Sequence, residues 1–213
     1  MLNLKQELSH VIWIGGSPCS GKSTIAEKLS RKYDFYYYSC DLHHEQHIQR
    51  CNPAEHPFMQ RLKDLSSNEI WNRPVIQQIH EEMEYYQDEF SMIVDDLISL
   101  PKHQMIIVEG TAAIPESVAP VLTHPGQAIW IVPAPEFQVL HYSQRSWIQD
   151  VLKECDDPGL AFQNWMNRDI GFAHKITQDA LDRGLKVITV DGTKSIEDHL
   201  EEIEQHLKDW LNF

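Results

Sequence analysis

A glycine-rich segment near the start of the chain carries residue types that could bind a polyphosphate. Residues 16–23 read GSPCSGKS and fit the pattern G-x-x-x-x-G-K-[ST] at every fixed position. An apolar, strand-like run precedes the segment and a run with helical spacing follows it, which is the context that the motif requires. Glycines let the backbone turn its N–H groups inward as an anion nest, and a helix N-terminus adds partial positive charge. The pattern therefore predicts nucleoside-triphosphate binding and leaves the reaction open.

Two side chains of this segment indicate how a triphosphate would be held. Lys22 can reach the β- and γ-phosphates, and the Ser23 hydroxyl can ligate Mg²⁺. We therefore expect ATP and Mg²⁺ as cofactors; ATP is favoured over GTP because nothing in the sequence reads as the guanine motif N-K-x-D. The residues expected to contact the nucleotide here are Gly16, Ser17, Pro18, Cys19, Ser20, Gly21, Lys22, Ser23 and Thr24.

Strand-like and helix-like segments alternate along the chain. Five short runs rich in β-branched or aromatic residues predict buried strands: HVIWIGG (10–16), FYYYSCD (35–41), MIIVEG (105–110), AIWIVP (128–133) and KVITVDG (186–192). Apolar residues recur at three- and four-residue steps over 75–98, and the last helix is expected after Ser195 as its N-cap. Gly184 stands where a helix C-cap glycine belongs. This alternation predicts an α/β fold with a parallel sheet covered on both faces.

Composition limits the possible partners. The formal net charge of −14 argues against a general nucleic-acid binder, which needs a basic surface. The N-terminal segment lacks the features of a signal peptide, and no apolar run approaches the ~18–20 residues that span a bilayer. The four cysteines show neither metal-ligand spacing nor a disulfide framework. We therefore expect a cytoplasmic protein with no nucleic-acid or membrane partner.

Two connections are longer than plain crossovers. About 60 residues separate the second strand from the third, and about 50 separate the fourth from the fifth. Each is a candidate for an inserted segment with a functional role, and one of them could be a mobile lid.

With this motif and element order, the chain resembles the P-loop kinases of nucleotides and small metabolites. That group includes nucleoside monophosphate, shikimate and gluconate kinases and chloramphenicol phosphotransferase. The likeness covers most of the chain in the spacing of its elements. Its specific motif is confined to residues 16–23, and the short runs CD, IIVEG and VDGTKSIED show weaker similarity. It implies the three-layer P-loop NTPase fold, with a five-stranded parallel sheet in the order 2-3-1-4-5. It further implies one domain, 1–213, with a helical substrate-binding insertion at about 43–100 and an arginine-bearing lid at about 145–170.

Two carboxylates lie at expected strand ends, where open α/β folds bind ligands. Asp41 ends FYYYSCD, and in kinases of this type a similarly placed aspartate accepts or orients the proton of the acceptor hydroxyl. The alternative is an aspartate that caps the next helix. Glu109 ends MIIVE and could hold a Mg²⁺-bound water or the substrate; the alternative is a carboxylate bonded to loop amides.

Further residues are implied by the resemblance. Arg145 and Arg168 lie in the expected lid, where a guanidinium could stabilise the migrating phosphoryl group; the alternative is surface pairing, and Asp169 adjoins Arg168. Gly192 and Thr193 lie in VDGTKSIED, which resembles a loop that packs against adenine; the alternative is a plain strand-to-helix turn.

Two other groups of residues have an open interpretation. Histidines 43, 44 and 47 follow Asp41 and could suggest a metal cluster. No third ligand pattern accompanies them, which favours contact with the acceptor or a surface position. Basic residues between 43 and 74 could clamp an acidic or phosphorylated acceptor or form ordinary surface pairs, and they are Arg50, Arg61, Lys63 and Arg73.

Three functions follow from these observations. The leading one is an ATP-dependent kinase that transfers the γ-phosphoryl group to a hydroxyl of a small-molecule acceptor. The second is a nucleoside or nucleotide kinase. The third is a nucleotide-binding regulator or ATPase switch. The large insertion next to Asp41 favours a pocket for a second substrate, and the acceptor and the oligomeric state stay open.

Overall fold

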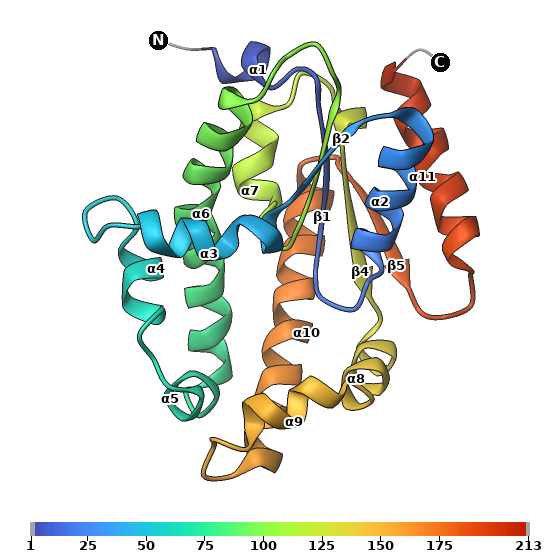
Figure 1. The fold of residues 1–213 in the computed structure, drawn as a ribbon. Coiled ribbons are helices and arrows are strands. Elements are labelled where there is room, and N and C mark those ends of the chain that lie inside the picture. Colours follow the sequence, from blue (N-terminus) through green and yellow to red (C-terminus); the bar gives the residue numbers. More distant parts are fainter. Residues whose placement is uncertain (1–2, 212–213) are drawn as a thin grey trace.

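A parallel sheet of five strands forms the centre of the molecule (Figure 1). In this computed structural model, which describes residues 3–211, the strand order is β2-β3-β1-β4-β5. The strands are β1 (Val11–Gly16), β2 (Tyr36–Ser39), β3 (Ile106–Glu109), β4 (Ala128–Pro133) and β5 (Lys186–Val190). The predicted fold class and strand order 2-3-1-4-5 are confirmed.

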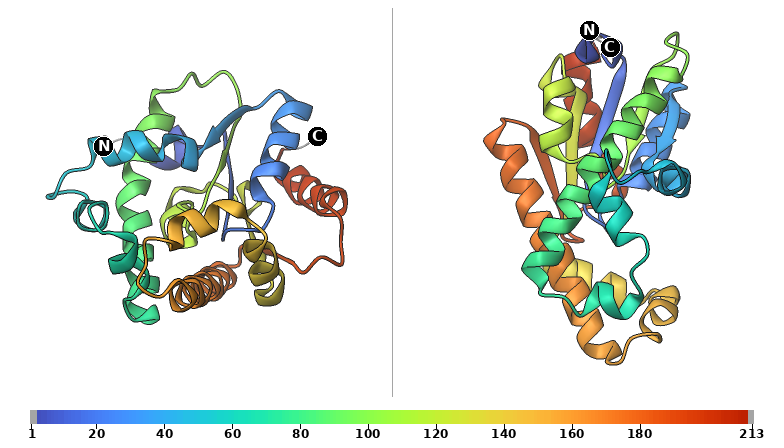
Figure 2. Two further views of the ribbon diagram at one scale, coloured as in Figure 1. Left: turned by 60° about the horizontal axis from the view of Figure 1, so that its bottom comes forward. Right: turned by 90° about the vertical axis from the view of Figure 1, so that its left-hand side faces the viewer.

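Helices cover both faces of the sheet, because side chains of each strand alternate between the two (Figure 2). Ile12 and Ile14 of β1 belong to the core formed with α2 (Lys22–Tyr33) and α11 (Ile196–Leu211). Trp13 belongs to the core on the other face, formed with α6 (Val75–Ser99) and α10 (Pro158–Asp182). β1 and β4 therefore read as continuous apolar runs, since they are buried on both faces along their whole length.

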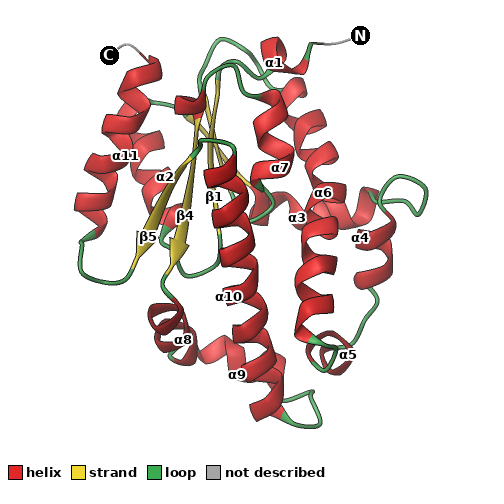
Figure 3. Cartoon of the chain, turned by 180° about the vertical axis from the view of Figure 1, so that it is seen from behind, coloured by secondary structure: helices red, strands yellow, loops and turns green. Residues whose placement is uncertain are grey.

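The shorter helices lie in the connections between strands. α1 (Leu4–Glu7) precedes β1, and α7 (Pro115–Val118) with the 3₁₀ turns Ala119–Val121 and Pro125–Gln127 connects β3 to β4. The insertion after β2 consists of α3 (Cys40–Arg50), α4 (Pro57–Leu62) and α5 (Ser67–Trp71). The connection after β4 begins with α8 (Pro135–Ser143) and α9 (Ser146–Leu152). Figure 3 shows the arrows of β4 and β5 pointing toward the end of the molecule where α8 and α9 lie.

The two long connections meet beyond this end of the sheet. Trp71 of α5 stacks on Trp165 of α10, with ring centroids 4.2 Å apart. The Asn68 side-chain amide donates to Asp156, and its oxygen accepts from the Asp156 backbone N–H, at 2.9 and 3.1 Å. Buried residues of α5, α8, α9 and α10 form a third apolar cluster around these contacts.

The two helix-capping residues predicted from the sequence lie at the expected helix ends. The Ser195 hydroxyl accepts from the Asp198 N–H at 3.1 Å ahead of α11, and Gly184 follows α10 with φ +70°. One boundary differs: β2 ends at Ser39, so Asp41 lies in the first turn of α3 and not in the strand. No helix within residues 3–211 is long and apolar enough to cross a membrane.

Candidate active site

The phosphate loop lies between β1 and α2, and its backbone leaves room only for glycine at two points. A Cβ at Gly16, where φ is +139°, would lie 1.9 Å from the Ile131 carbonyl oxygen. Gly21 has φ +78° and directly precedes α2. Cys19 also adopts a positive φ, of +66°, although it is not glycine. The loop is thus held in a turn that L-residues rarely adopt, as an anion nest requires.

Lys22 is the first residue of α2 and is only 6% exposed. Its Nζ lies 3.5 Å from the Ser17 carbonyl oxygen, so the side chain folds back across the loop. The hydroxyls of Ser17 and Ser20 are buried and have no hydrogen-bond partner among the described residues. The loop thus presents an ammonium group together with unsatisfied hydroxyls.

A cleft of about 480 Å³ opens beside this loop at the carboxyl edge of the sheet. Nine of the residues predicted from the sequence for the nucleotide and the chemistry line it: Pro18, Cys19, Ser20, Gly21, Lys22, Ser23, Thr24, Asp41 and Arg145. The sequence had not indicated the remaining wall residues, which are Tyr86, Thr111, Tyr142 and Trp147. These come from four separate segments, so no local pattern could have grouped them.

Glu109 lies behind the cleft and is 1% exposed. The Ser23 hydroxyl donates to its Oε2 at 3.1 Å. Its Oε1 accepts from the hydroxyls of Tyr37 and Ser39 at 2.9 and 2.8 Å. Three donors therefore fix this carboxylate, and Ser23 keeps its oxygen lone pairs free because its proton is donated to Glu109.

A buried histidine anchors α3, the helix that carries Asp41. His47 is fully buried, with Nδ1 2.9 Å from Glu89 and Nε2 2.9 Å from Asp96, both on α6. A ring whose two nitrogens both face carboxylates donates from both and is therefore an imidazolium. Burial lowers the pKa of His47, but the hydrogen bonds to these carboxylates outweigh burial and raise it. Among the described residues no group of three or more His, Cys, Asp or Glu side chains could hold a metal ion.

The two predicted lid arginines lie in different surroundings. Arg145 is exposed at the N-cap of α9, with its guanidinium 5.0 Å from the Tyr142 ring and 6.0 Å from the Trp147 ring. Arg168 is largely buried on α10 and does not line the cleft. It pairs with Glu82 at 2.8 Å and with Asp169 at 2.6 Å. The structure thus brings Arg145 to the phosphate loop and separates Arg168 from it.

Burial raises the pKa of both Glu82 and Asp169, and the charge of Arg168 only partly opposes this effect. One guanidinium faces two carboxyl groups in this cluster, so the two acids retain a proton more readily than exposed acids do.

A second pocket, of about 320 Å³, adjoins the cleft at Tyr86, which lines both. Its walls come from α3, α6, α10 and the segment around α4 and α5. The sequence led us to expect a second-substrate pocket in the insertion, but not that α10 would contribute to its wall. The lining residues are His44, Leu62, Lys63, Ile70, Arg73, Gln78, Glu82, Tyr85, Tyr86 and Arg168.

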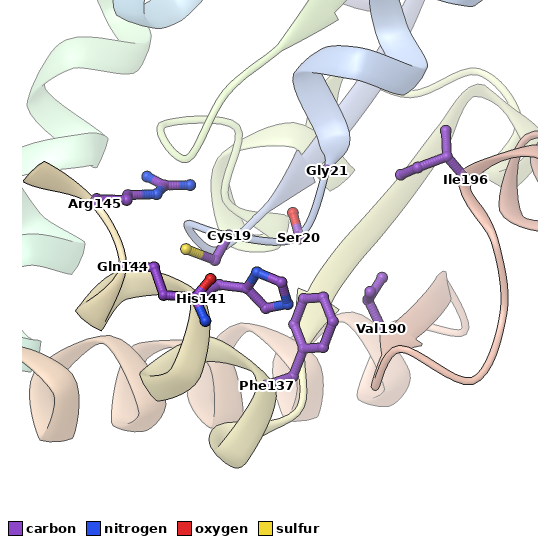
Figure 4. A pocket seen from close by; sticks show the side chains of 9 residues that line it. All are labelled: Cys19, Ser20, Gly21, Phe137, His141, Gln144, Arg145, Val190 and Ile196. Atoms are coloured by element: carbon purple, nitrogen blue, oxygen red, sulfur yellow. The ribbon is translucent and has the colours of Figure 1, made fainter.

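A third pocket, of about 410 Å³, lies on the other side of the phosphate loop and shares Cys19, Ser20, Gly21 and Arg145 with the cleft. Figure 4 shows the adjacent rings of Phe137 and His141 reaching from α8 into it. Their centroids are 4.1 Å apart, and Val190 and Ile196 complete the apolar wall.

The predicted residues Gly192 and Thr193 lie beside this third pocket without lining it. A Cβ at Gly192 would lie 3.1 Å from the Phe137 ring. The N–H and hydroxyl of Thr193 both donate to Asp191, at 2.9 and 2.7 Å. The loop therefore supports the pocket wall through Phe137, and its own polar groups are engaged in a local turn.

The strand order and a phosphate loop between β1 and α2 define the fold of P-loop nucleoside-triphosphate-binding proteins. No family model matches the chain, and no curated protein matches it.

Three solved structures align with nearly the whole chain at low sequence identity. A shikimate kinase from Bacteroides thetaiotaomicron aligns over 95% of this chain and 98% of its own, at 13% identity and a TM-score of 0.46. A dephospho-CoA kinase from Campylobacter jejuni aligns over 95% and 97%, at 16% identity and a TM-score of 0.45. The YorR protein from Bacillus subtilis, in complex with phosphorylated GDP, aligns over 95% and 98%, at 12% identity and a TM-score of 0.48.

Proposed function

We propose that this chain is an ATP- and Mg²⁺-dependent kinase that transfers the γ-phosphoryl group to a hydroxyl of a small metabolite. One observation carries the proposal: a single cleft is lined by Lys22, Ser23, Asp41 and Arg145, and it shares the wall residue Tyr86 with a second pocket. A nucleotide switch needs the phosphate loop alone, whereas a kinase needs adjoining room for an acceptor.

The nucleotide is assigned to the phosphate loop and the third pocket. The loop N–H groups and Lys22 hold the phosphates, and the base enters between the loop and the rings of Phe137 and His141. The apolar side chains of Val190 and Ile196 suit a flat base, which supports the adenine assignment by shape.

The residues present fit a Mg²⁺ ion next to the β- and γ-phosphates. Ser23 lines the cleft and donates its proton away from it to Glu109, so its oxygen can act as a ligand. Glu109 does not line the cleft, and its role here is to orient Ser23. When bound, the ion neutralises charge that develops between the β- and γ-phosphates.

Transfer needs a proton acceptor, an in-line approach and stabilisation of charge. The acceptor oxygen forms a bond to the γ-phosphorus while the bond to the bridging oxygen breaks, and ADP leaves. Asp41 orients the acceptor hydroxyl and takes its proton. Lys22 and Arg145 stabilise the negative charge on the oxygens of the migrating group.

Segment 145–170 is assigned as a lid over the cleft. It carries Arg145 at the start of α9 and contacts α5 of the insertion through the Asn68–Asp156 hydrogen bonds. Its closure over both substrates would exclude water that otherwise accepts the phosphoryl group.

The test is ADP release with Mg²⁺ and ATP, measured against a panel of hydroxylated metabolites and nucleosides. A kinase gives slow release alone and strong stimulation by at least one acceptor. Stimulation by nucleosides only would make the protein a nucleoside kinase. ATP hydrolysis that no acceptor stimulates would favour the switch and contradict the proposal.

A further inference from the structure

Two side chains that line the second pocket each carry a buried oxygen atom with no hydrogen-bond partner within residues 3–211. These atoms are Oε1 of Gln78 and Oε2 of Glu82, in side chains that are 3% and 8% exposed. The Gln78 amide nitrogen is already engaged, since it donates to the carbonyls of Trp71 and Arg73 at 3.3 and 2.7 Å. Buried acceptors are nearly always satisfied, and leaving them unpaired is costly. This part of the wall therefore suits a molecule that supplies O–H or N–H donors.

The rest of the wall carries excess positive charge. Three cationic side chains and one carboxylate line the pocket, namely Lys63, Arg73, Arg168 and Glu82. Arg168 is neutralised in place by Glu82 and Asp169. The positive excess is therefore set by Lys63 and Arg73.

The charge around Arg73 is not fully balanced. Glu81 pairs with Arg73 and also accepts from Arg61 at 2.7 Å, so one carboxylate serves two guanidinium groups. Lys63 is exposed and forms no ion pair within the described part of the chain. A local positive excess in a protein of net charge −14 favours an anionic group at this position.

We propose that the phosphoryl acceptor is a small hydroxylated acid. Its hydroxyls donate to Gln78 Oε1 and Glu82 Oε2, and its carboxylate or phosphate faces Lys63 and Arg73. The inference rests on the proposed kinase function, because the hydroxyl that receives the phosphoryl group must extend past Tyr86 into the cleft. A volume of about 320 Å³ lies at the lower end of the range for small-molecule sites, which fits a molecule of this size.

The first arm of the test compares ligands matched in hydroxyls and different in charge. Binding to the whole protein is measured by calorimetry for gluconate against sorbitol and for glycerol 3-phosphate against glycerol. The charged member of at least one pair should bind about tenfold more tightly than its uncharged counterpart. The pair that shows the difference identifies the anion as carboxylate or phosphate. Equal binding within both pairs, or no binding by either acid, would overturn the inference.

The second arm changes one charge on the protein. Lys63→Gln should weaken binding of the preferred acid roughly two- to fivefold, as expected for an exposed charge, and leave the uncharged partner unaffected. Lys208→Gln on α11 removes an exposed lysine outside this pocket and serves as the matched control. Equal effects of the two substitutions would overturn the assignment of the anion to Lys63.

The third arm deletes hydroxyls from the ligand and leaves the protein unchanged. At least one deoxy analogue of the preferred acid should bind about tenfold more weakly, because Gln78 Oε1 or Glu82 Oε2 again lacks a donor. Analogues that all bind like the parent acid would overturn the hydroxyl contacts.

ADP release distinguishes failure of the acid proposal from failure of the kinase proposal. Stimulation by uncharged acceptors alone refutes the acid and keeps the kinase, whereas stimulation by no acceptor refutes the kinase.

Discussion

The Ser23 hydroxyl donates to the Glu109 carboxylate across the carboxyl edge of the sheet, at 3.1 Å. Ser23 lies in the first turn of α2 and Glu109 at the end of β3, so the bond joins the phosphate loop to the neighbouring strand. It directs the Ser23 proton away from the cleft and leaves the oxygen available to a cation. The proposed Mg²⁺ site therefore depends on a residue that does not touch the cleft.

Glu109→Gln tests this dependence. The amide nitrogen can replace Oε1, where it would face both Tyr37 and Ser39, or Oε2, where it would face Ser23 alone. The second arrangement displaces fewer donors, so we expect Ser23 to lose its fixed orientation. We expect the Mg²⁺ concentration for half-maximal ADP release to rise about 10- to 100-fold. Tyr37→Phe is the control, because it removes another donor to Glu109 and leaves the Ser23 bond intact. An unchanged Mg²⁺ requirement in the glutamine variant would refute the positioning role.

Asp41→Asn tests the proposed proton acceptor. The substitution keeps the shape of an exposed side chain in the first turn of α3, so the fold should be retained. We expect kcat to fall about 10²- to 10⁴-fold while ATP affinity changes little. Glu45→Gln, one helical turn further along α3 and outside the cleft wall, is the matched control. Weaker ATP binding with normal kcat would instead place Asp41 at the metal or the nucleotide.

Arg145 and Arg168 should respond in opposite ways to replacement by alanine. Arg145→Ala removes an exposed guanidinium and should lower kcat about 10²-fold with the melting temperature nearly unchanged. Arg168→Ala leaves Glu82 and Asp169 buried without their cation, which should cost about 3–5 kcal/mol of stability. Thermal unfolding and kinetics on both variants check this contrast. A stable Arg168 variant with lost transfer would give Arg168 the catalytic role instead.

The His47 cluster predicts a pH dependence of stability. The folded-state pKa of His47 is raised above its ordinary value, so its contribution is complete below about pH 6.5 and is lost as pH rises through the raised pKa. The pKa values of Glu89 and Asp96 are lowered, so these carboxylates lose their stabilising contribution only when the pH falls into the acid range. His44 also bonds to Glu89, and its raised pKa acts in the same direction.

Urea unfolding between pH 6 and pH 9 measures this effect. Stability of the wild type should decline above pH 6.5, and His47→Asn should be less stable at pH 6 with a flatter profile. His124→Asn, a substitution outside this cluster, should keep the wild-type slope. An unchanged slope in the His47 variant would show that other groups set the pH dependence.

The strands and the phosphate loop could be predicted because their causes are local. Strands buried on both faces read as apolar runs, and the loop needs glycine where its backbone turns, as at Gly16 and Gly21. The predicted end of the second strand was wrong: β2 stops at Ser39 and α3 begins at the next residue, so Asp41 lies in the helix and not in the strand.

The sequence predicted a pocket for a second substrate but not the residues that line it, because its walls come from helices that meet only in the folded chain. The sequence shows Asp169 next to Arg168 but gives no sign that Glu82 of α6 pairs with the same guanidinium. His47 likewise shows helical spacing from His43, and the sequence favoured acceptor contact or a surface position over a metal cluster. Its partners are in fact Glu89 and Asp96, which α6 brings alongside.

Transfer of a labelled γ-phosphoryl group is the most direct test of the central claim. ATP labelled at the γ-position is incubated with Mg²⁺, the protein and the acceptor that most stimulates ADP release, and the products are separated. The kinase account predicts label on the acceptor in an amount equal to ADP formed, and a loss of about 10²-fold or more in Lys22→Ala without loss of fold. Label found only in inorganic phosphate, or equal transfer by the Lys22 variant, would contradict it.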